Sequence, residues 1–286
     1  SDAIDVCFSP DASGPGAPGL LFTTPSGLKR LTVQPGAPDI YSVQLLSSAA
    51  LWCNAMLIRS SVGVGSGPGQ GLIGVHSNEH TFFTASPAGT SFAAPATIFE
   101  LPPYARDVVL LDWNGLPDNK REIGILHSNG IQIRDAFGNV LLARSAVNPG
   151  DAIAVVAKSG LTDSLAWVTR LSSGNSNLLV FNQGFPGLYQ PPQDLGARVY
   201  GSMASEDLLG DGDGDLVFGG ALWSTLQIRE NDSSAATWFS PQTTEEVDLR
   251  IDGGAGPPMV PVGKVLCANL FNDWTDDTPL PGFAAV

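Results

Sequence analysis

A strand-loop-hairpin unit that recurs along the chain is the feature that most constrains its fold. Each copy has an apolar strand, a loop and then two short strands around a tight turn, and the clearest copy covers residues 107–144. In that copy Asn129 and Gly130 separate two alternating apolar runs, which is a strong hairpin signal. Such recurrence predicts an array of small sheets, with copies that begin near residues 4, 51, 107, 152, 197 and 264.

The fold class that these units predict is all-β, as a single β-propeller domain over residues 1–286. Six units with about 23 strand candidates come close to the 24 strands of six four-stranded blades, with seven blades as the alternative. We expect strands at residues 51–58 and 197–200 to open two of the units. The last unit stops half-way, so we expect the N-terminal strand at 4–8 to pair with the C-terminal strand at 282–286 and close the ring. A pair of β-sandwiches would not explain the shared strand order.

Composition agrees with an all-β protein and narrows the partners. The chain has 33 glycines and 22 prolines, and only 15% of its residues are charged, so turns are frequent. A net charge of −14 argues against a nucleic-acid partner and suits cation binding or an extracellular setting. No apolar run approaches the roughly 18 residues of a membrane span, so we expect no membrane insertion. The chain begins at Ser1, which fits a secreted or cell-surface protein whose signal segment was removed, or a chain simply cut there.

The cysteines Cys7, Cys53 and Cys267 are too few for a disulfide scaffold and lack the paired spacing of a zinc site. We expect them to be buried in packing. If the ring closes, Cys7 and Cys267 come near each other and could form a bridge.

The acidic loop at residues 207–220 carries the strongest chemical signal. Asp207, Asp211 and Asp215 recur at every fourth residue, with Asp213 between them, in a glycine-rich turn that runs into a strand. Calcium takes six to eight oxygens from a flexible loop, and glycine lets carboxylates and carbonyls converge. We therefore predict a calcium site. The alternative is that the aspartates cap the turn by accepting backbone N–H groups, without metal.

Two other loops repeat this spacing of oxygen-bearing side chains, one of them with two residues inserted. Residues 159–163 lack these acids, so that turn is expected to be structural. The two further candidate sets are Asn269, Asp273 and Asp277 in the last unit, and Asp112, Asn114, Asp118 and Glu122 in the third.

These units resemble the FG-GAP or VCBS-type repeat of integrin-like β-propellers, in which an apolar strand precedes Asp-x-Asp/Asn-x-Asp-Gly-x-x-Asp. In that family the first, third, fifth and ninth loop positions bind calcium, with a carbonyl from the seventh. The resemblance implies ligands at Asp207, Asp211 and Asp215 and the carbonyl of Asp213. Leu209 stands at the third position and removes one side-chain ligand. Phe271 does the same in the last unit.

Trp113 and Trp274 lie inside the acidic loops rather than in strands. An exposed indole there could stack on the face of a sugar ring or on a partner protein, so both are candidate ligand-binding residues. The alternative is that they pack between blades.

Three short motifs suggest other chemistry. Residues 89–95 resemble the serine motif of subtilisin-type proteases, but neither His76 nor His80 lies in that family's histidine motif, so the match is accidental. These two histidines flank a turn between strands, where an i, i+4 pair does not bind zinc as it would on a helix. Asn231 and Ser233 form a glycosylation sequon that matters only in a secretory pathway.

The function that these features favour is a non-catalytic, extracellular recognition module, lectin-like or adhesin-like, with calcium-rigidified loops. Its partner would be a carbohydrate or an extracellular protein. One alternative is an enzyme of the propeller type, a lyase or hydrolase acting at the central channel. Inner strands such as 108–111 and 153–156 disfavour it, because they are almost wholly apolar and carry few groups for acid–base catalysis. A ligand-free repeat scaffold is the other alternative.

Overall fold

A computed structural model describes the chain in segments and divides it into two compact units. Each unit is treated by itself. Unit 1 comprises Ser1–Leu110, Leu116–Ser128 and Gln132–Ala143, and unit 2 comprises Leu111–Gly115, Asn129–Ile131 and Arg144–Val286. The described residues are 5–9, 19–34, 37–53, 56–60, 71–76, 81–85, 87–88, 91–92, 94, 96–100, 102, 104–115, 122–156, 162–183, 192–197, 200–208, 214–220, 225–231, 239, 245–248, 265–268 and 282–285.

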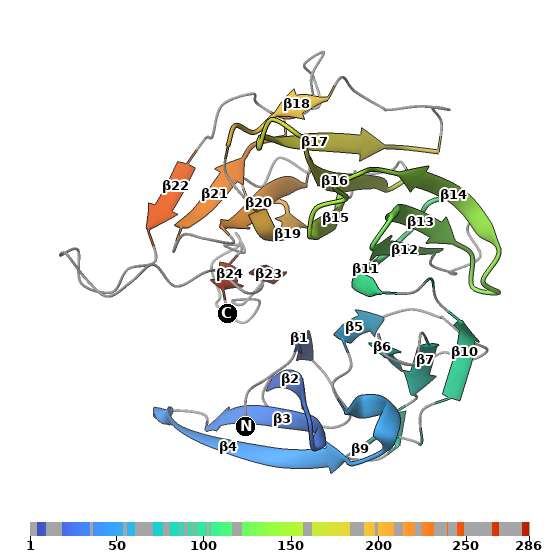
Figure 1. Ribbon diagram of the computed structural model, residues 1–286. Helices are drawn as coiled ribbons and strands as arrows, with labels where there is room; N and C mark the ends of the chain where they lie inside the picture. The colour runs from blue at the N-terminus through green and yellow to red at the C-terminus, as the bar shows by residue number, and fades with distance from the viewer. Residues whose placement is uncertain are drawn as a thin grey trace. The chain divides into compact units, whose positions relative to one another are not determined.

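The described strands form antiparallel sheets, most of them four-stranded (Figure 1). The first sheet has the order β1 (Asp5–Ser9), β2 (Gly19–Thr24), β3 (Gly27–Gln34) and β4 (Ala37–Ser47). The second has the order β10 (Ala96–Glu100), β7 (Thr81–Ala85), β6 (Gly71–His76) and β5 (Met56–Ser60). The third has the order β11 (Ala105–Leu111), β12 (Glu122–His127), β13 (Gly130–Arg134) and β14 (Val140–Ser145).

Two more four-stranded sheets and two strand pairs follow the same antiparallel rule. The fourth sheet contains β15 (Ala152–Val156), β16 (Ser164–Arg170), β17 (Ser176–Phe181) and β18 (Gln193–Asp194). The fifth contains β19 (Tyr200–Glu206), β20 (Asp215–Gly220), β21 (Thr225–Arg229) and β22 (Glu245–Asp248). The two pairs are β23 (Val265–Ala268) with β24 (Gly282–Ala285), and β8 (Pro87–Ala88) with β9 (Ser91–Phe92); a 3-10 turn, η1, covers Ala50–Trp52.

In the third, fourth and fifth sheets the second strand is the most deeply buried part. Every residue of β12 and of β20 is buried, and in β16 only the last residue, Arg170, is partly exposed. A strand buried on both faces must carry apolar or satisfied side chains at successive positions, which explains runs such as Leu165 to Val168. The fourth strand β14 is instead open to solvent along most of its length.

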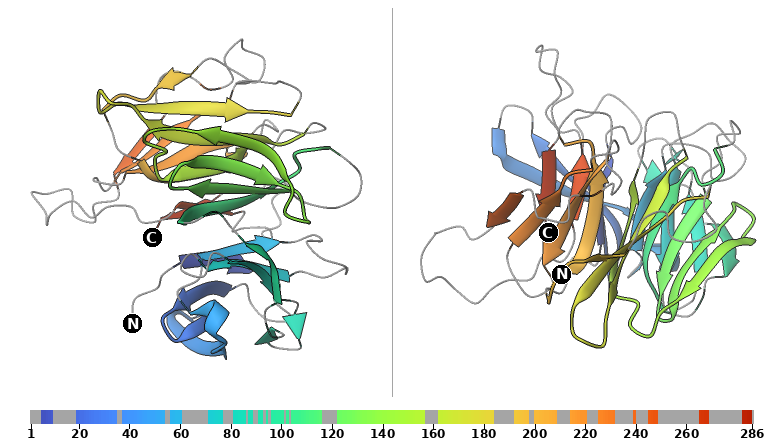
Figure 2. Two further views of the ribbon diagram at one scale, coloured as in Figure 1. Left: turned by 45° about the vertical axis from the view of Figure 1, so that its right-hand side comes forward. Right: turned by 90° about the horizontal axis from the view of Figure 1, so that it is seen from above.

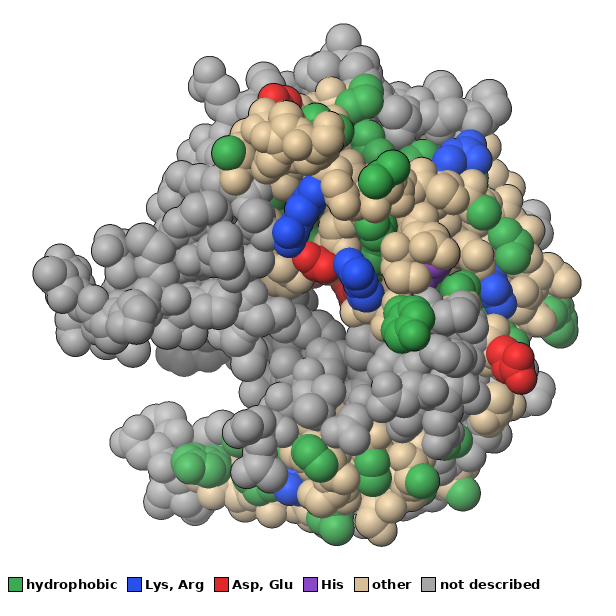
Figure 3. All heavy atoms as spheres, viewed as in Figure 1, with side chains coloured by type: hydrophobic (Ala, Val, Ile, Leu, Met, Phe, Trp, Pro, Cys, Tyr) green, Lys and Arg blue, Asp and Glu red, His purple; other side chains and the backbone are tan. Residues whose placement is uncertain are grey.

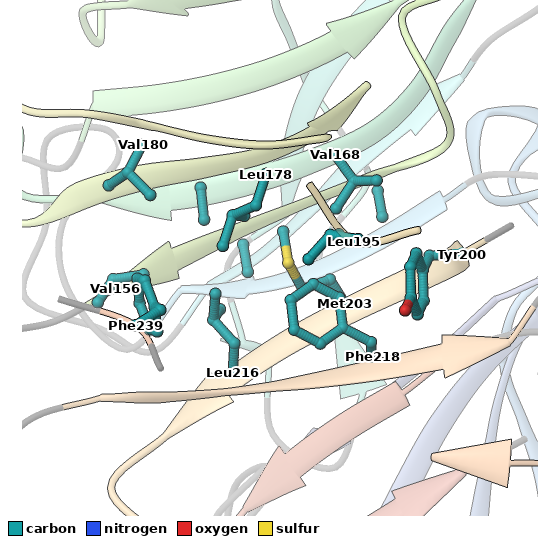
Figure 4. Packing of buried hydrophobic residues seen from close by; sticks show 13 residues of the cluster. Val156, Val168, Leu178, Val180, Leu195, Tyr200, Met203, Leu216, Phe218 and Phe239 are labelled. Atoms are coloured by element: carbon teal, nitrogen blue, oxygen red, sulfur yellow. The ribbon is translucent and has the colours of Figure 1, made fainter. Parts of the chain in front are cut away.

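The core of unit 2 lies between the fourth and fifth sheets, which face each other in Figures 1 and 2. Figure 4 shows how side chains from both sheets fill this space. Phe218 of β20 packs against the ring of Tyr200 on β19, with centroids 5.1 Å apart. The Tyr200 hydroxyl donates to Gln227 Oε1 at 2.5 Å, so the polar end of this buried ring is satisfied. The cluster consists of Ala152, Ala154, Val156, Ala166, Val168, Leu178, Val180, Leu195, Tyr200, Met203, Leu216, Phe218 and Phe239.

Exposed apolar side chains are concentrated on outer strands and turns. Tyr41, Val43 and Leu45 of β4 are all exposed, as are Val140 and Leu141 of β14. The face seen in Figure 3 also shows apolar side chains scattered among polar ones. Many apolar atoms remain on the surface of any folded protein, so these residues alone do not mark a binding face.

Two turn glycines hold the third strand of a sheet close to the fourth. Gly130 begins β13 with φ +145°, and a Cβ there would lie 2.0 Å from the Arg144 carbonyl oxygen on β14. Gly27 begins β3 with φ +121°, and a Cβ there would lie 2.1 Å from the Ser47 carbonyl oxygen on β4. The same device thus recurs in the first and third sheets, and it explains why glycine follows Asn129 in the predicted hairpin.

Three of the predicted repeat starts lie near the first strands of sheets. The starts near 107, 152 and 264 lie within a few residues of the beginnings of β11, β15 and β23. The chain is all-β as expected, and the hairpin at Asn129 and Gly130 is confirmed. In the described part of the chain no helix is long and apolar enough to cross a membrane.

Two expected strand positions were wrong. Residues 51–58 do not form one strand, because η1 occupies Ala50–Trp52, with the buried Trp52 as its last residue, and β5 begins only at Met56. The strand expected at 197–200 instead runs from Tyr200 to Glu206. Its sequence is too polar to stand out as an apolar run, and its burial depends on packing against β15.

Ring closure stays a prediction. Among the described ladders β1 pairs with β2 and β23 pairs with β24, and no ladder joins β24 to β1. Cys7 lies on β1 and Cys267 on β23, but their side chains lie outside what the structure describes. Cys53 is a free, half-buried thiol.

We expect Gly130→Ala to destabilise the protein by about 3 kcal/mol or more, since it combines an unfavourable positive φ with a clash against backbone that cannot move freely. Gly174→Ala is the matched control, because Gly174 has φ +90° but no atom lies within 4 Å of the position that a Cβ would take there. It should cost only about 1 to 2 kcal/mol. Urea unfolding of both variants measures the difference, and equal losses would show that β14 relaxes away from the turn.

Candidate functional site

The acidic loop of the fifth sheet connects β19 to β20. Asp207 and Leu208 follow the end of β19, and Gly214 precedes Asp215, the first residue of β20. Asp211 and Asp213 lie outside the described residues. The structure therefore describes the two ends of the loop, and these ends meet at Asp215.

Asp215 ties the loop to its sheet. The side chain is fully buried, with 0% exposure. Its Oδ2 accepts a hydrogen bond from the Leu208 backbone N–H at 3.0 Å, and its Oδ1 accepts one from the Asn231 backbone N–H at 2.9 Å. A carboxylate that accepts backbone N–H groups in a buried setting makes strong, charge-assisted bonds. Asp215 thus caps the turn, which is the metal-free alternative considered for this loop. Metal ligation by the same residue stays a prediction.

Asn231 completes this anchor, and sequence reasoning missed its role. It lies two residues beyond β21, is 0% exposed, and donates from Nδ2 to the Gly214 carbonyl oxygen at 3.1 Å. Its backbone also forms an isolated bridge with Phe239. The sequon at Asn231 is therefore out of reach of a glycosylating enzyme in the folded protein. The only sequence signal was an amide residue shortly after a strand end.

Glu206, the last residue of β19, brings another acid to this end of the sheet. It lies opposite Asp215 in the β19–β20 register. Burial raises the pKa of the Glu206 carboxyl, and the negative charge of the neighbouring Asp207 raises it further. Acids on adjacent positions of the two strands make this edge electronegative, which favours a cation.

The second candidate loop is joined to the next sheet through Asp163. Asp163 Oδ2 accepts from the Asp112 backbone N–H at 2.6 Å, and the Asp163 N–H donates to the Asp112 carbonyl at 2.9 Å. Asp112 Oδ1 accepts from the Gly115 N–H at 2.8 Å, which closes the turn locally. Residues 159–163 were expected to form a structural turn, and the described Asp163 indeed makes structural bonds.

An amide residue supports the Asp163 turn in a manner similar to Asn231. Asn182 follows β17 directly and donates from Nδ2 to the Thr162 carbonyl at 3.4 Å, to Thr162 Oγ1 at 3.2 Å and to Ser164 Oγ at 3.1 Å. Both sheets thus use an asparagine after the third strand to hold the loop before the second strand.

The remaining predicted ligands either lie apart from one another or fall outside the residues that the structure describes. Asn114 is partly exposed beyond β11, and Glu122 is buried at the start of β12. Among described residues, no group of three or more His, Cys, Asp or Glu side chains could hold a metal ion. The predicted residues outside the described segments are Asp118, Asn269, Asp273, Asp277 and Trp274.

Trp113 is buried, which is the second of the two alternatives considered for this residue. Its side chain is only 5% exposed, so the ring offers no face for stacking on a sugar. The loop is drawn inward because Gly115, with φ +62°, lies so near Thr162 that a Cβ would be 2.7 Å from the Thr162 methyl group. This position agrees with the alternative that Trp113 packs in the interior.

Comparisons with known proteins identify the fold. Neither a family model nor a curated protein matches the sequence. A triple arginine-to-alanine mutant of AofleA from Arthrobotrys oligospora superposes with a TM-score of 0.53 at 12% identity, over 85% of this chain and 72% of AofleA. AofleA and the other solved structures that this chain resembles are β-propellers. The present chain has the β-propeller fold.

Two further structures give the same result. BBS1N, solved in complex with ARL6DN and soaked with mercury, matches with a TM-score of 0.50 at 9% identity, over 92% of this chain and 69% of BBS1N. Sqt1 from Saccharomyces cerevisiae matches with a TM-score of 0.50 at 10% identity, over 92% of this chain and 64% of Sqt1. Identities this low show the fold alone. In a propeller the four-stranded sheets described above are the blades.

Glu206→Gln should stabilise the protein at neutral pH. Because the folded-state pKa of Glu206 is raised above its ordinary value of 4.5, the ionised carboxyl costs stability at pH 7, and that cost disappears as pH falls below 4.5. In EDTA we expect a rise in Tm of about 1 to 2 °C at pH 7 that vanishes near pH 4. The expected rise is small because solvent screens the charge of this half-buried carboxyl. Glu100→Gln, an exposed carboxyl, is the control. A rise that persists at low pH would contradict the electrostatic cause.

Asp215→Ala should destabilise the metal-free protein by about 3 kcal/mol or more, because it leaves two backbone N–H groups without their buried acceptor. Asp135→Ala is matched to it: Asp135 Oδ1 also accepts two backbone N–H bonds, from Phe137 and Asn139, but at the surface. It should cost about 1 kcal/mol. Urea unfolding in EDTA compares the two. If Asp215→Ala were harmless in EDTA and damaging only with calcium, Asp215 would be a ligand and not an anchor.

Proposed function

We propose that this β-propeller is a non-catalytic, extracellular recognition module that binds a carbohydrate or a protein partner through loops stabilised by calcium. The observation that carries the proposal is the anchored acidic loop of the fifth sheet. Asp215 and Asn231 fix both ends of a segment whose sequence has acids at 207, 211, 213 and 215. A loop with a fixed base and a high density of oxygen ligands suits cation binding, and a fixed loop suits recognition.

The residues present fit a calcium ion. Calcium prefers carboxylate, amide and carbonyl oxygens, and Asp207, Asp211, Asp213 and Asp215 supply carboxylates within nine positions of one another. The buried Asn231 Oδ1 is an oxygen acceptor with no hydrogen-bond partner among the described residues. These residues would hold the ion, which would neutralise the acids and stiffen the loop. The resemblance to FG-GAP and VCBS-type repeats supports the same assignment, with the loops at 112–122 and 269–277 as further candidates.

The partner class rests on the fold and on composition. Propeller loops commonly carry binding sites on a rigid scaffold. BBS1N was solved in complex with ARL6DN, which makes a protein ligand reasonable for a propeller of this kind. A net charge of −14 disfavours nucleic acid, and it suits a secreted or cell-surface setting. We further propose one domain over residues 1–286 with six blades, closed by the terminal strands.

Thermal unfolding tests the calcium part of this proposal. The EDTA-stripped protein should gain several degrees in Tm with millimolar calcium, because a ligand that binds only the native state stabilises it. The double variant Asp211→Ala/Asp213→Ala should lose that gain while keeping the Tm of the metal-free protein, since it leaves the Asp215 anchor in place. No gain in the wild type would reduce these acids to turn caps.

Binding assays test the recognition part. The calcium-loaded protein should bind a subset of glycans on an array or a specific extracellular protein, and EDTA should abolish that binding. Cleavage of a bound polysaccharide would instead support the lyase or hydrolase alternative. Binding to nothing in either assay, with a full calcium effect on Tm, would support a ligand-free scaffold.

A further inference from the structure

The amide oxygen of Asn231 is a buried acceptor that the fold leaves without a donor. Asn231 has 0% exposure, and both of its donor groups are used: the backbone N–H donates to Asp215 Oδ1 and Nδ2 donates to the Gly214 carbonyl. The orientation of the amide is fixed, because a carbonyl oxygen can only accept and so must face Nδ2. No partner for Oδ1 exists among the residues that the structure describes. A buried polar atom in this state calls for a specific explanation.

The hydrogen bonds of Asn231 place its side chain at the same end of the sheet as the acids of the loop. Oδ1 shares its carbon with Nδ2, so it lies beside the same end of the acidic loop, where Gly214 and Asp215 present oxygens. Across the β19–β20 register from Asp215 lies Glu206, with Asp207 next along the chain. An unsatisfied acceptor among carbonyl and carboxylate oxygens is typical of the inside of a hard-cation site.

We propose that Asn231 Oδ1 is an additional calcium ligand, contributed to the acidic loop from outside it. This inference rests on the proposed calcium loop and adds a residue that the repeat pattern does not contain. Leu209 stands where that pattern has an oxygen ligand, so the loop alone is one side-chain oxygen short. Asn231 supplies the missing oxygen from the chain beyond β21, sixteen residues after Asp215.

Asn182 occupies the corresponding position in the fourth sheet, beside a loop with few acids. It holds its own loop through three Nδ2 hydrogen bonds, but that loop carries a single acid, Asp163, between 157 and 163. Asn182 is therefore the matched control. A substitution there removes a comparable buried amide and leaves the acidic loop untouched.

Calcium binding to the EDTA-stripped full chain tests the proposal, by isothermal titration and by the calcium-induced shift in Tm. We expect Asn231→Leu, which has similar volume and no oxygen, to weaken calcium binding by about tenfold or more. Asn231→Asp should tighten binding and enlarge the Tm shift, because ligand charge raises calcium affinity. Asn182→Leu should lower Tm in EDTA and with calcium alike and leave the calcium affinity unchanged.

The outcomes distinguish failure of the calcium part of the proposed function from failure of the Asn231 inference alone. Wild-type protein that binds no calcium would overturn the calcium part of the proposed function and this inference with it. Wild-type binding with an unchanged affinity in Asn231→Leu would overturn the inference alone, and Oδ1 would then face a structural water. If Asn231→Leu does not fold, Asn231→Asp decides by itself, since unchanged or weaker binding in that variant contradicts a ligand role.

Discussion

Burial of the second strands on both faces is the constraint on which the rest of this structure depends. β12, β16 and β20 keep almost no residue in contact with solvent, so each sheet needs apolar partners on either side. In unit 2 that need is met where the fourth and fifth sheets meet, around Phe218 and Leu178. Hydrophobic burial of this kind is non-directional and would tolerate small shifts of one sheet past the other. Directional hydrogen bonds at the ends of the strands add positional restraints that hydrophobic burial does not provide.

Polar side chains at the ends of strands supply that direction. Asp163 joins the turn after β11 to the start of β16, and Asp215 joins the start of β20 to residues 208 and 231. Each is an acid at the edge of the apolar core, where water is scarce and a charge-assisted bond is strong. The acids that made these loops look like metal sites are thus partly structural.

Sequence reasoning located the inner strands well because their burial on both faces produces continuous apolar runs, such as 152–156 and 165–168. It failed at the outer strand β22 for the opposite reason, because Glu245, Glu246, Val247 and Asp248 form no apolar run. It misplaced β19 because small and polar residues surround Met203, whose burial comes from tertiary packing. The hairpin at Gly130 was predictable, since its turn is encoded locally.

The roles of Asp215 and Asn231 show where the site itself escapes prediction. The spacing of the acids is a local pattern, and it found the loop. Whether a given acid caps a turn or faces a ligand depends on which backbone N–H groups the fold brings to it, and the Asn231 N–H arrives from sixteen residues away. A loop whose base is already ordered loses less conformational entropy when an ion binds, so the same bonds that make Asp215 structural would raise the affinity of the loop for a cation.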